Sequence, residues 1–414
     1  MMKKRVVITG MGIVSPLGND VDIFWDNLVA GKNGITTQDW LVEDGYNATV
    51  AAAIKDPVDI DDVVDFKEAR RMDPFTRFSV YAAKHAISQS QLDIANEDPN
   101  RMGVIIGSGV GGLYTFQEQH AMLIQKGHRR VSPFFIPMMI PDIAAGFVSI
   151  IWGLKGPNFS VNSACATAAH AIGLGMRAIR YGDADVMICG GSDAAMTSMG
   201  FAGFANMKAL TFNPDPDSAS RPFDKGRDGF VMGEGAGVFV LESLEHAQAR
   251  GTNILAELSG FGMTADAYHI TSPAAGGEGA NRAMKMALSD GDLLPTDIDY
   301  INAHGTSTPA NDKNESIAIK AVFGEHAYKL AVSSTKSMTG HLLGASGGIE
   351  LAALVKTIQT NTIAPTIHHE NPCDDCDLDY TPKVAAQREV RAGISNSFGF
   401  GGHNAVLAVK EFKT

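Results

Sequence analysis

Two periodicities of apolar residues recur along the whole chain. Short apolar runs bounded by glycine, proline or polar residues indicate buried β-strands, and apolar residues three or four positions apart indicate helices. In the first half the pattern predicts strands at residues 5–9, 102–107, 159–162 and 185–190, and helices at residues 21–30, 72–90 and 166–180. This alternation of strands and helices is typical of layered α/β proteins.

A second series of strands and helices begins near residue 255. Strands are predicted at residues 256–262, 298–303, 330–334, 391–395 and 405–411, and helices at residues 280–289, 312–323 and 346–361. Two such series indicate two similar halves packed back to back, although no sequence repeat is evident between them. We therefore expect an N-terminal half over residues 1–251 and a C-terminal half over residues 252–414.

Residues 134–154 form the most apolar window of the chain and are long enough for a membrane span. Pro137, Pro141 and Asp142 interrupt this window, so a buried core or a subunit interface is the better interpretation. The basic start of the chain is not followed by a signal-peptide core or a cleavage site. With four cysteines and no disulfide framework, the chain is expected in the reducing cytoplasm.

The net negative charge of the chain argues against two classes of binding partner. Lys and Arg number 34 against 46 Asp and Glu, which gives a formal net charge of −12. Non-specific binding to nucleic acid or to an anionic membrane surface requires clustered basic charge, so neither is expected. A hydrophobic fraction of 45% is that of a globular protein with a full core.

Cys165 is the first candidate for chemistry, because it ends an extended run and is followed at once by a helix of small residues. A sharp strand-to-helix turn places its sulfur at a helix N-terminus, where the partial positive charge favours the thiolate. The small neighbours leave room for a substrate to approach. The alternative is a buried structural cysteine, since free cysteines are among the most buried residues.

Two later strands end in residues that could act together with such a cysteine. One runs into His304, and the other runs into Lys336 and His341, ahead of a helix that carries Glu350. The carboxyl ends of strands in open α/β sheets carry the side chains that contact ligands. A glycine-rich loop at residues 393–404 bears two phenylalanines and is a candidate gate over a site.

Taken together, these segments resemble the β-ketoacyl-acyl carrier protein synthases, the elongating condensing enzymes of fatty acid synthesis, and are most similar to the type II bacterial enzymes. The resemblance runs from residue 4 to residue 411 and includes further motifs at residues 5–12, 107–112, 221–224 and 227–230. It implies a thiolase-like α/β fold, in which two βα halves build a five-layered α-β-α-β-α body. A cysteine with two histidines resembles the elongating enzymes, whereas initiating synthases pair cysteine with histidine and asparagine.

The resemblance also implies catalytic roles. Cys165 would take the acyl group from an acyl-acyl carrier protein, in an oxyanion hole formed by its own backbone N–H and that of Phe400. His304 and His341 would support the decarboxylation of malonyl-acyl carrier protein. The enolate would then attack the acyl-cysteine and yield a chain two carbons longer. Lys336 would set the electrostatics of the site rather than act as the base.

The remaining expectations concern binding and partners. The enzyme would have no cofactor or metal of its own, because 4′-phosphopantetheine arrives on the acyl carrier protein. The acyl chain and the pantetheine arm would contact Val110, Phe135, Phe204, Thr306, Thr308, Phe398 and Phe400, with Phe135 reaching across a homodimer interface, while Glu350 would anchor Lys336. An acidic carrier needs a basic docking patch. The candidates are Lys67, Arg70, Arg71 and Lys208, with Arg129 and Arg130 as further ones.

Several motifs have weaker interpretations. Residues 10–15 lack the third glycine of a dinucleotide fingerprint, and no nicotinamide cofactor is expected. A zinc site is disfavoured because adjacent histidines rarely reach one metal; its ligands would be His368, His369, Cys373 and Cys376. The family makes a monovalent cation conceivable near Asn302, Glu350 and Asn396. His403 occupies a position where the family usually carries a small polar residue.

Five other functions are the alternatives. A type I elongating synthase or a polyketide ketosynthase would share the same residues. A non-catalytic chain-length partner subunit would lack the nucleophile, whereas Cys165 is present. A thiolase needs a second catalytic cysteine, and residues 393–404 contain none. A cysteine hydrolase would need access for water and one oriented histidine instead of two.

Overall fold

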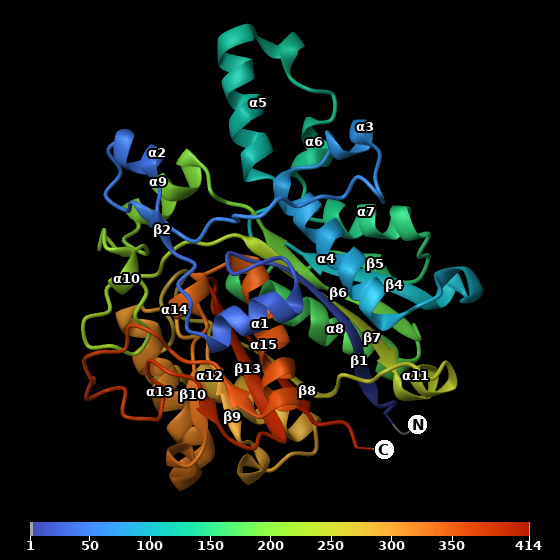
Figure 1. The fold of residues 1–414 in the computed structure, drawn as a ribbon. Coiled ribbons are helices and arrows are strands. Elements are labelled where there is room, and N and C mark those ends of the chain that lie inside the picture. Colours follow the sequence, from blue (N-terminus) through green and yellow to red (C-terminus); the bar gives the residue numbers. More distant parts are fainter. Residues whose placement is uncertain (1–2, 414) are drawn as a thin grey trace.

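The computed structural model describes residues 3–413, which build a mixed ten-stranded sheet covered by helices (Figure 1). The strand order is β10-β9-β13-β14-β8-β1-β7-β6-β4-β5. The strands before residue 250 are β1 (Val6–Val14), β4 (Met102–Gly107), β5 (Asn158–Phe159), β6 (Val186–Asp193) and β7 (Gly235–Ser243). Those after it are β8 (Ala256–Ala265), β9 (Tyr300–Asn302), β10 (Ala331–Ser333), β13 (Ala392–Gly399) and β14 (His403–Lys410).

The two halves of this sheet repeat one topology. From the centre outward, β1-β7-β6-β4-β5 matches β8-β14-β13-β9-β10. In each half the first two pairings are antiparallel and the last two are parallel. A short antiparallel pairing of Val7 and Ile8 with Glu257 and Ala256 joins the halves. The predicted pair of similar βα halves therefore matches the observed strand pairing.

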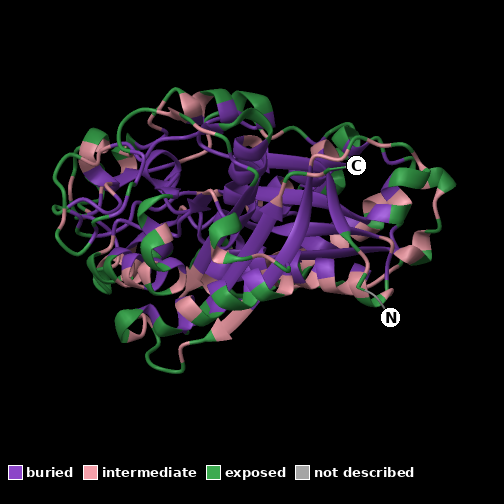
Figure 2. Cartoon of the chain, turned by 90° about the horizontal axis from the view of Figure 1, so that it is seen from below, coloured by how far each residue is buried: buried purple, intermediate pink, exposed green. Residues whose placement is uncertain are grey.

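Helices form layers on both sides of each half-sheet. α4 (Pro74–Ser90) and α7 (Ile143–Trp152) cover the outer face of the first half, and α12 (Glu278–Asp290), with α13 (Pro309–Phe323) beside it, covers the second. α8 (Thr167–Tyr181) and α15 (Ser346–Thr360) contact strands of both halves. Figure 2 shows the strands buried at the centre and the exposed residues on the outer helices. The order of layers is α-β-α-β-α.

A glycine pair makes β1 longer than predicted. The sequence predicts that this strand ends at residue 9, because glycines such as Gly10 and Gly12 commonly interrupt strands. Both glycines lie inside the strand, where an added Cβ would overlap the carbonyl oxygens of Ala86 and Ala82 on α4. Glycine at these positions lets the helix pack closely on the strand. The same packing explains why residues 10–15 look like part of a dinucleotide fingerprint although no nucleotide is expected.

The same contact occurs in the second half of the chain. An added Cβ at Gly260 or Gly262 of β8 would overlap the carbonyl oxygens of Ala287 and Ala283 on α12. In both halves the central strand carries two glycines that are two residues apart. The helix that packs against it carries two alanines that are four residues apart. This short pattern is a trace of internal repetition that inspection of the sequence did not reveal.

The other described helices are α1 (Val21–Val29), α2 (Asp39–Glu43), α3 (Phe66–Ala69), α5 (Leu113–Lys126), α6 (Phe135–Met139), α9 (Ser198–Asn206), α10 (Pro216–Ala219), α11 (Leu244–Ala249) and α14 (Lys336–Thr339). Two small sheets pair β2 (Thr36–Thr37) with β3 (Val50–Ala51) and β11 (Thr362–Ile363) with β12 (Ala386–Gln387). The apolar window at residues 134–154 supplies α6 and α7. Among residues 3–413, no helix is both long enough and apolar enough to span a bilayer.

A buried carboxylate ties the centre of the sheet to α11. One oxygen of Glu242 on β7 accepts hydrogen bonds from Thr9 Oγ1 of β1 and from Arg250 Nη2, the second at 2.6 Å. The other oxygen lies 2.5 Å from His246 Nδ1. Burial raises the pKa of Glu242, but these partners outweigh burial and lower the pKa to about 2. The carboxylate is therefore charged and fully paired at neutral pH.

Candidate active site

Cys165 lies in a short 3-10 turn, Ala164–Ala166, that runs directly into α8. Ala164 has a φ of 50°, in the left-handed region that costs a non-glycine residue free energy. This turn places the Cys165 sulfur at the N-terminus of α8, and the residue is 8% exposed. The backbone thus holds a nearly buried thiol at the start of a helix.

The thiolate expected for Cys165 is not the resting form. Burial raises the pKa of Cys165 to about 12, while the charge of Lys336 and the backbone N–H of Phe400 act in the opposite direction. Loss of hydration outweighs the favourable field at the helix N-terminus. The helix N-terminus favours the thiolate, but burial dominates, so the thiol must lose its proton when it attacks.

His304, which comes shortly after β9, is fixed through its backbone. Glu315 on α13 accepts the N–H of His304 and the N–H of Gly305, both at 2.8 Å. Lys336 Nζ donates to the carbonyl oxygen of His304 at 2.6 Å and lies 3.5 Å from its Nδ1. Because an ammonium group can only donate, Nδ1 is the acceptor, and the proton of the neutral ring lies on Nε2.

His341 stands next to His304 and precedes α15. Its Nδ1 lies 2.8 Å from Ser346 Oγ. The two imidazole rings meet edge to face, with centroids 5.4 Å apart and planes at 87°. Burial and the charge of Lys336 lower the pKa of both histidines well below the ordinary value, so both rings are neutral near pH 7.

Lys336 and Glu350 form an ion pair inside the protein, between Nζ and Oε1. Among the described residues, the second Glu350 oxygen, the Asn302 side chain, Asn396 Oδ1 and Ser395 Oγ are buried without a hydrogen-bond partner. Buried oxygen atoms with no donor fit a small hard cation. These residues therefore fit the monovalent cation that the family resemblance allows.

A cavity of about 500 Å³ brings the candidate residues together. Cys165 lines it from the first half of the chain, and His304 and His341 line it from the second. Of the residues expected to contact substrate, the cavity wall includes Val110, Phe204, Thr306, Thr308, Phe398 and Phe400. Phe135 is not part of this wall; it lies on α6, with its ring centroid 6.3 Å from that of Phe116.

The glycine-rich loop after β13 brings Phe400 to Cys165. A Cβ on Gly399 would lie 2.6 Å from Ser163 O and 3.1 Å from Cys165 N, so no side chain fits there. Gly401 and Gly402 adopt left-handed φ values of 85° and 74°. The backbone N–H of Phe400 acts on the Cys165 sulfur and lowers the pKa of the thiol against the effect of burial.

Asp193 is a positioning residue that the sequence reasoning missed. Its carboxylate accepts the backbone N–H groups of Val110 at 3.1 Å, Gly109 at 2.9 Å and Gly344 at 2.5 Å, and the hydroxyl of Ser108 at 2.6 Å. Burial raises its pKa to about 6 against these hydrogen bonds. Asp193 thereby ties the Val110 loop to the segment that follows His341. The sequence feature that could have indicated Asp193 is a single acidic residue at the end of an apolar strand that contains glycine.

Four of the basic residues expected to dock a carrier fall in two places. Lys67 and Arg70 are exposed at α3, and the neighbouring Arg71 lies 4.1 Å above the ring of Phe134. Lys208 follows α9 and lines the cavity. Figure 1 shows α3 beside α6 and well apart from α9. One chain therefore does not gather all these residues into a single patch.

The proposed zinc ligands do not converge. No group of three or more His, Cys, Asp or Glu side chains that could hold a metal occurs between residues 3 and 413. His368 Nδ1 instead lies 2.9 Å from the carbonyl oxygen of Ser220, and Cys373 Sγ accepts from Arg227. His403 is exposed at the start of β14.

The fold and this site define a ketosynthase of the thiolase-like class. Residues 3–247 match the family model described as Beta-ketoacyl synthase, N-terminal domain, and residues 255–370 match Beta-ketoacyl synthase, C-terminal domain. The chain belongs to the beta-ketoacyl synthase family.

Relatives of known name cover the whole chain. It is 54% identical over 410 residues to 3-oxoacyl-(acyl-carrier-protein) synthase 2 of Staphylococcus aureus, which covers 99% of each chain. The protein of the same name from Synechocystis sp. is 50% identical over 412 residues, again covering 99% of each.

Solved structures share the complete fold. A ketosynthase of a type II polyketide synthase, in complex with its acyl-carrier protein, superimposes with a TM-score of 0.92 at 33% identity and covers 100% of both chains. A beta-ketoacyl synthase from Burkholderia phymatum gives a TM-score of 0.91 at 35% identity, covering 99% of this chain and 100% of the other. The predicted thiolase-like fold is confirmed.

Proposed function

We propose that this chain is an elongating β-ketoacyl-acyl carrier protein synthase that lengthens acyl chains by two carbons. The observation that carries the proposal is the meeting of Cys165, His304 and His341 at one buried cavity. The names of the relatives that are 50% and 54% identical support the same activity.

The first half-reaction loads the acyl chain onto Cys165. The sulfur attacks the carbonyl carbon of an acyl thioester on the carrier as the thiol gives up its proton. Backbone N–H groups of Cys165 and Phe400 stabilise the tetrahedral oxyanion. Collapse of the intermediate expels the carrier thiolate, which recovers the proton, and leaves an acyl-cysteine.

The second half-reaction makes the carbon nucleophile. Malonyl-acyl carrier protein enters and places its thioester oxygen near the Nε2 atoms of His304 and His341. Carbon dioxide leaves, and the electron pair moves onto the thioester oxygen as an enolate. Neutral N–H donors in a cavity of low polarity stabilise such a charge, at about 3 kcal/mol per donor in comparable oxyanion holes.

Condensation completes the cycle. The enolate carbon attacks the acyl-cysteine carbonyl, and the carbon–sulfur bond to Cys165 breaks to release a β-ketoacyl chain on the carrier. The freed thiolate takes up one proton, so each cycle consumes one proton and releases one carbon dioxide. The reaction needs no resident organic cofactor, since the pantetheine arm belongs to the carrier.

Four further features belong to the same proposal. The carrier docks on basic residues at α3 and near Lys208, and the enzyme works as a homodimer in the cytoplasm with Phe135 crossing the interface. A solved ketosynthase in complex with its acyl-carrier protein supports the partnership. A small cation held near Glu350 would neutralise buried oxygen charge. The two functional halves divide at residues 251 and 252.

The test uses purified protein with acyl- and malonyl-acyl carrier proteins of varied chain length, followed by detection of β-ketoacyl product. Cys165→Ala is expected to abolish condensation. Cys165→Gln mimics the acylated state and is expected to retain malonyl decarboxylation, because His304 and His341 remain. Full elongation by Cys165→Ala would refute the nucleophile, and an inert Cys165→Gln protein would contradict the roles of the histidines.

A further inference from the structure

Cys373 and Cys376 stand outside the cavity, and the proposed reaction does not use them. The Cys376 N–H donates to the Cys373 carbonyl at 2.9 Å, and the two residues face each other as an antiparallel bridge. Such a turn keeps the two Cα atoms within about 7 Å. This separation lies in the range that a disulfide spans. Cys373 is partly exposed, whereas Cys376 is 4% exposed.

The Cys373 sulfur accepts a hydrogen bond from a guanidinium. Arg227 Nη1 donates to it at 3.3 Å, and the Asp375 N–H and the Cys376 thiol also lower the pKa of Cys373. Burial raises the pKa of Cys373, but these donors outweigh it and lower the pKa, whereas burial raises the pKa of Cys376 to about 12. An accessible sulfur held by donors beside a buried thiol is the arrangement of an attacking and a resolving cysteine.

We propose that Cys373 and Cys376 form a redox-active dithiol that is modified by low-molecular-weight disulfides such as glutathione disulfide. The Cys373 thiolate attacks one sulfur of glutathione disulfide, forms a mixed disulfide and releases one glutathione thiolate. Cys376 then attacks the Cys373 sulfur, forms the protein disulfide and releases the second glutathione. Two protein thiols are oxidised, one glutathione disulfide is reduced, and both protons pass to the released glutathiones.

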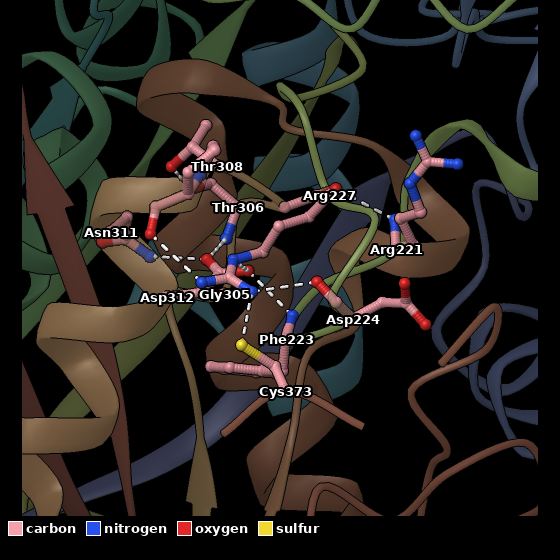
Figure 3. A network of polar contacts seen from close by, with 12 residues as sticks. Arg221, Phe223, Asp224, Arg227, Gly305, Thr306, Thr308, Asn311, Asp312 and Cys373 are labelled. Atoms are coloured by element: carbon pink, nitrogen blue, oxygen red, sulfur yellow. Dashed lines mark hydrogen bonds and ion pairs between the residues drawn. The ribbon is translucent and has the colours of Figure 1, made fainter. Parts of the chain in front are cut away.

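Figure 3 shows the Arg227 guanidinium between Cys373 and the segment that carries Thr306 and Asp312. Its Nη2 donates to Pro309 O at 3.2 Å, and its Nε lies 3.7 Å from Asp312 Oδ2. Asp312 Oδ1 in turn accepts the N–H of Thr306 at 3.0 Å. Thr306 and Pro309 both line the cavity. Arg227 is therefore shared between the Cys373 sulfur and the loop that borders the cavity.

Oxidation of the two cysteines removes one hydrogen-bond partner of Arg227. A disulfide carries no thiolate charge and turns the Cys373 sulfur towards Cys376, so Arg227 loses one partner. The segment at residues 304–312, which depends on the same guanidinium, becomes less well held. If the proposed function is correct, the affinity for the carrier arm at Thr306 falls as a result.

The redox test needs neither carrier nor turnover. The full-length protein is equilibrated in glutathione buffers from reduced to oxidised, the remaining thiols are alkylated, and the peptide that contains Cys373 and Cys376 is quantified by mass spectrometry. We expect this peptide to lose two hydrogen atoms, while buried Cys189 in the same sample stays a thiol. In Cys376→Ser the expected product is a lasting glutathione adduct on Cys373. Two unmodified thiols in oxidised buffer, or an adduct that never resolves in the wild type, would overturn the proposal.

A second measurement tests the connection to the cavity. Hydrogen exchange of residues 304–312 is compared between reduced and oxidised protein, with Cys373→Ser taken through the same treatment as the matched control. Faster exchange in the oxidised wild type alone is expected, and equal exchange would refute the connection. In the condensation assay the KM for malonyl carrier should rise at least about fivefold and recover with dithiothreitol. A protein with no condensing activity but with the expected exchange pattern would refute the proposed function and leave the dithiol standing.

Discussion

Gly399→Ala tests the placement of the oxyanion donor directly. The added Cβ would lie 2.6 Å from Ser163 O, whereas carbon–oxygen contacts begin near about 3.3 Å. The loop must therefore move by roughly 0.7 Å, taking the neighbouring Phe400 N–H with it. A misplacement of about 1 Å at a reacting centre costs up to about 10²-fold in rate. We expect kcat to fall by about 10²-fold.

The assay separates chemistry from folding. The rate of Cys165 acylation is followed by mass spectrometry of the intact protein, and condensation is measured with saturating carriers. Crowding of the loop should also lower the free energy of unfolding by about 1–3 kcal/mol. Gly203→Ala on α9 is the matched control, because an added Cβ there meets no atom within 4 Å. It should keep full activity and gain up to about 1 kcal/mol in stability.

Two results would refute the assignment of the Phe400 N–H. If Gly399→Ala folds, loads Cys165 and condenses at the rate of the wild type, the Phe400 N–H cannot be an essential donor. A loss of activity that tracks only the unfolded fraction would lead to the same conclusion. Slow acylation in a folded protein would support the assigned position of the N–H.

The remaining predictions concern stability and a second positioning contact. Ser346→Ala removes the partner of His341 Nδ1. Malonyl decarboxylation by Cys165→Gln/Ser346→Ala should therefore be about fivefold slower than by Cys165→Gln, since one hydrogen bond contributes about 1 kcal/mol. Glu242→Gln should lower the free energy of unfolding at pH 7 by about 3 kcal/mol, because a pKa lowered from 4.5 to about 2 stabilises the fold above pH 4.5. Because that stabilisation disappears as the pH falls through 2, urea titrations of the two proteins should converge there, and a constant difference would contradict the pairing. Gly262→Ala should prevent soluble expression, since its Cβ overlaps a helix carbonyl; a folded, active variant would show that α12 can move away.

Local pattern was sufficient for many elements of the fold. The prediction at residues 102–107 coincides with β4, because this strand is a continuous apolar run buried between neighbours. β7 was missed, although it pairs with β1 at the centre of the sheet. Its run begins with glycine and alanine and includes Glu242, whose burial becomes possible only when Arg250 and His246 fold against it.

The candidate site was predictable where chemistry follows directly after a strand or precedes a helix. Cys165, His304 and His341 all occupy such positions, so their sequence neighbours reveal them. The partners that position them are contributed by other segments, as with Asp193, which meets the Gly344 N–H across 151 residues. The raised pKa of Cys165 likewise results from burial by distant loops, which no local motif records.

The paired helices at the centre give the cavity an electrical character opposite to that of the whole molecule. The turns that start α8 and α15 pack against each other, and both contribute residues to the cavity wall. Each helix directs the positive end of its peptide dipoles there, equivalent to about half an elementary charge. A protein of net charge −12 therefore encloses a small positive well. That well acts on anions as they form during turnover, and each half of the chain contributes one of the two helices.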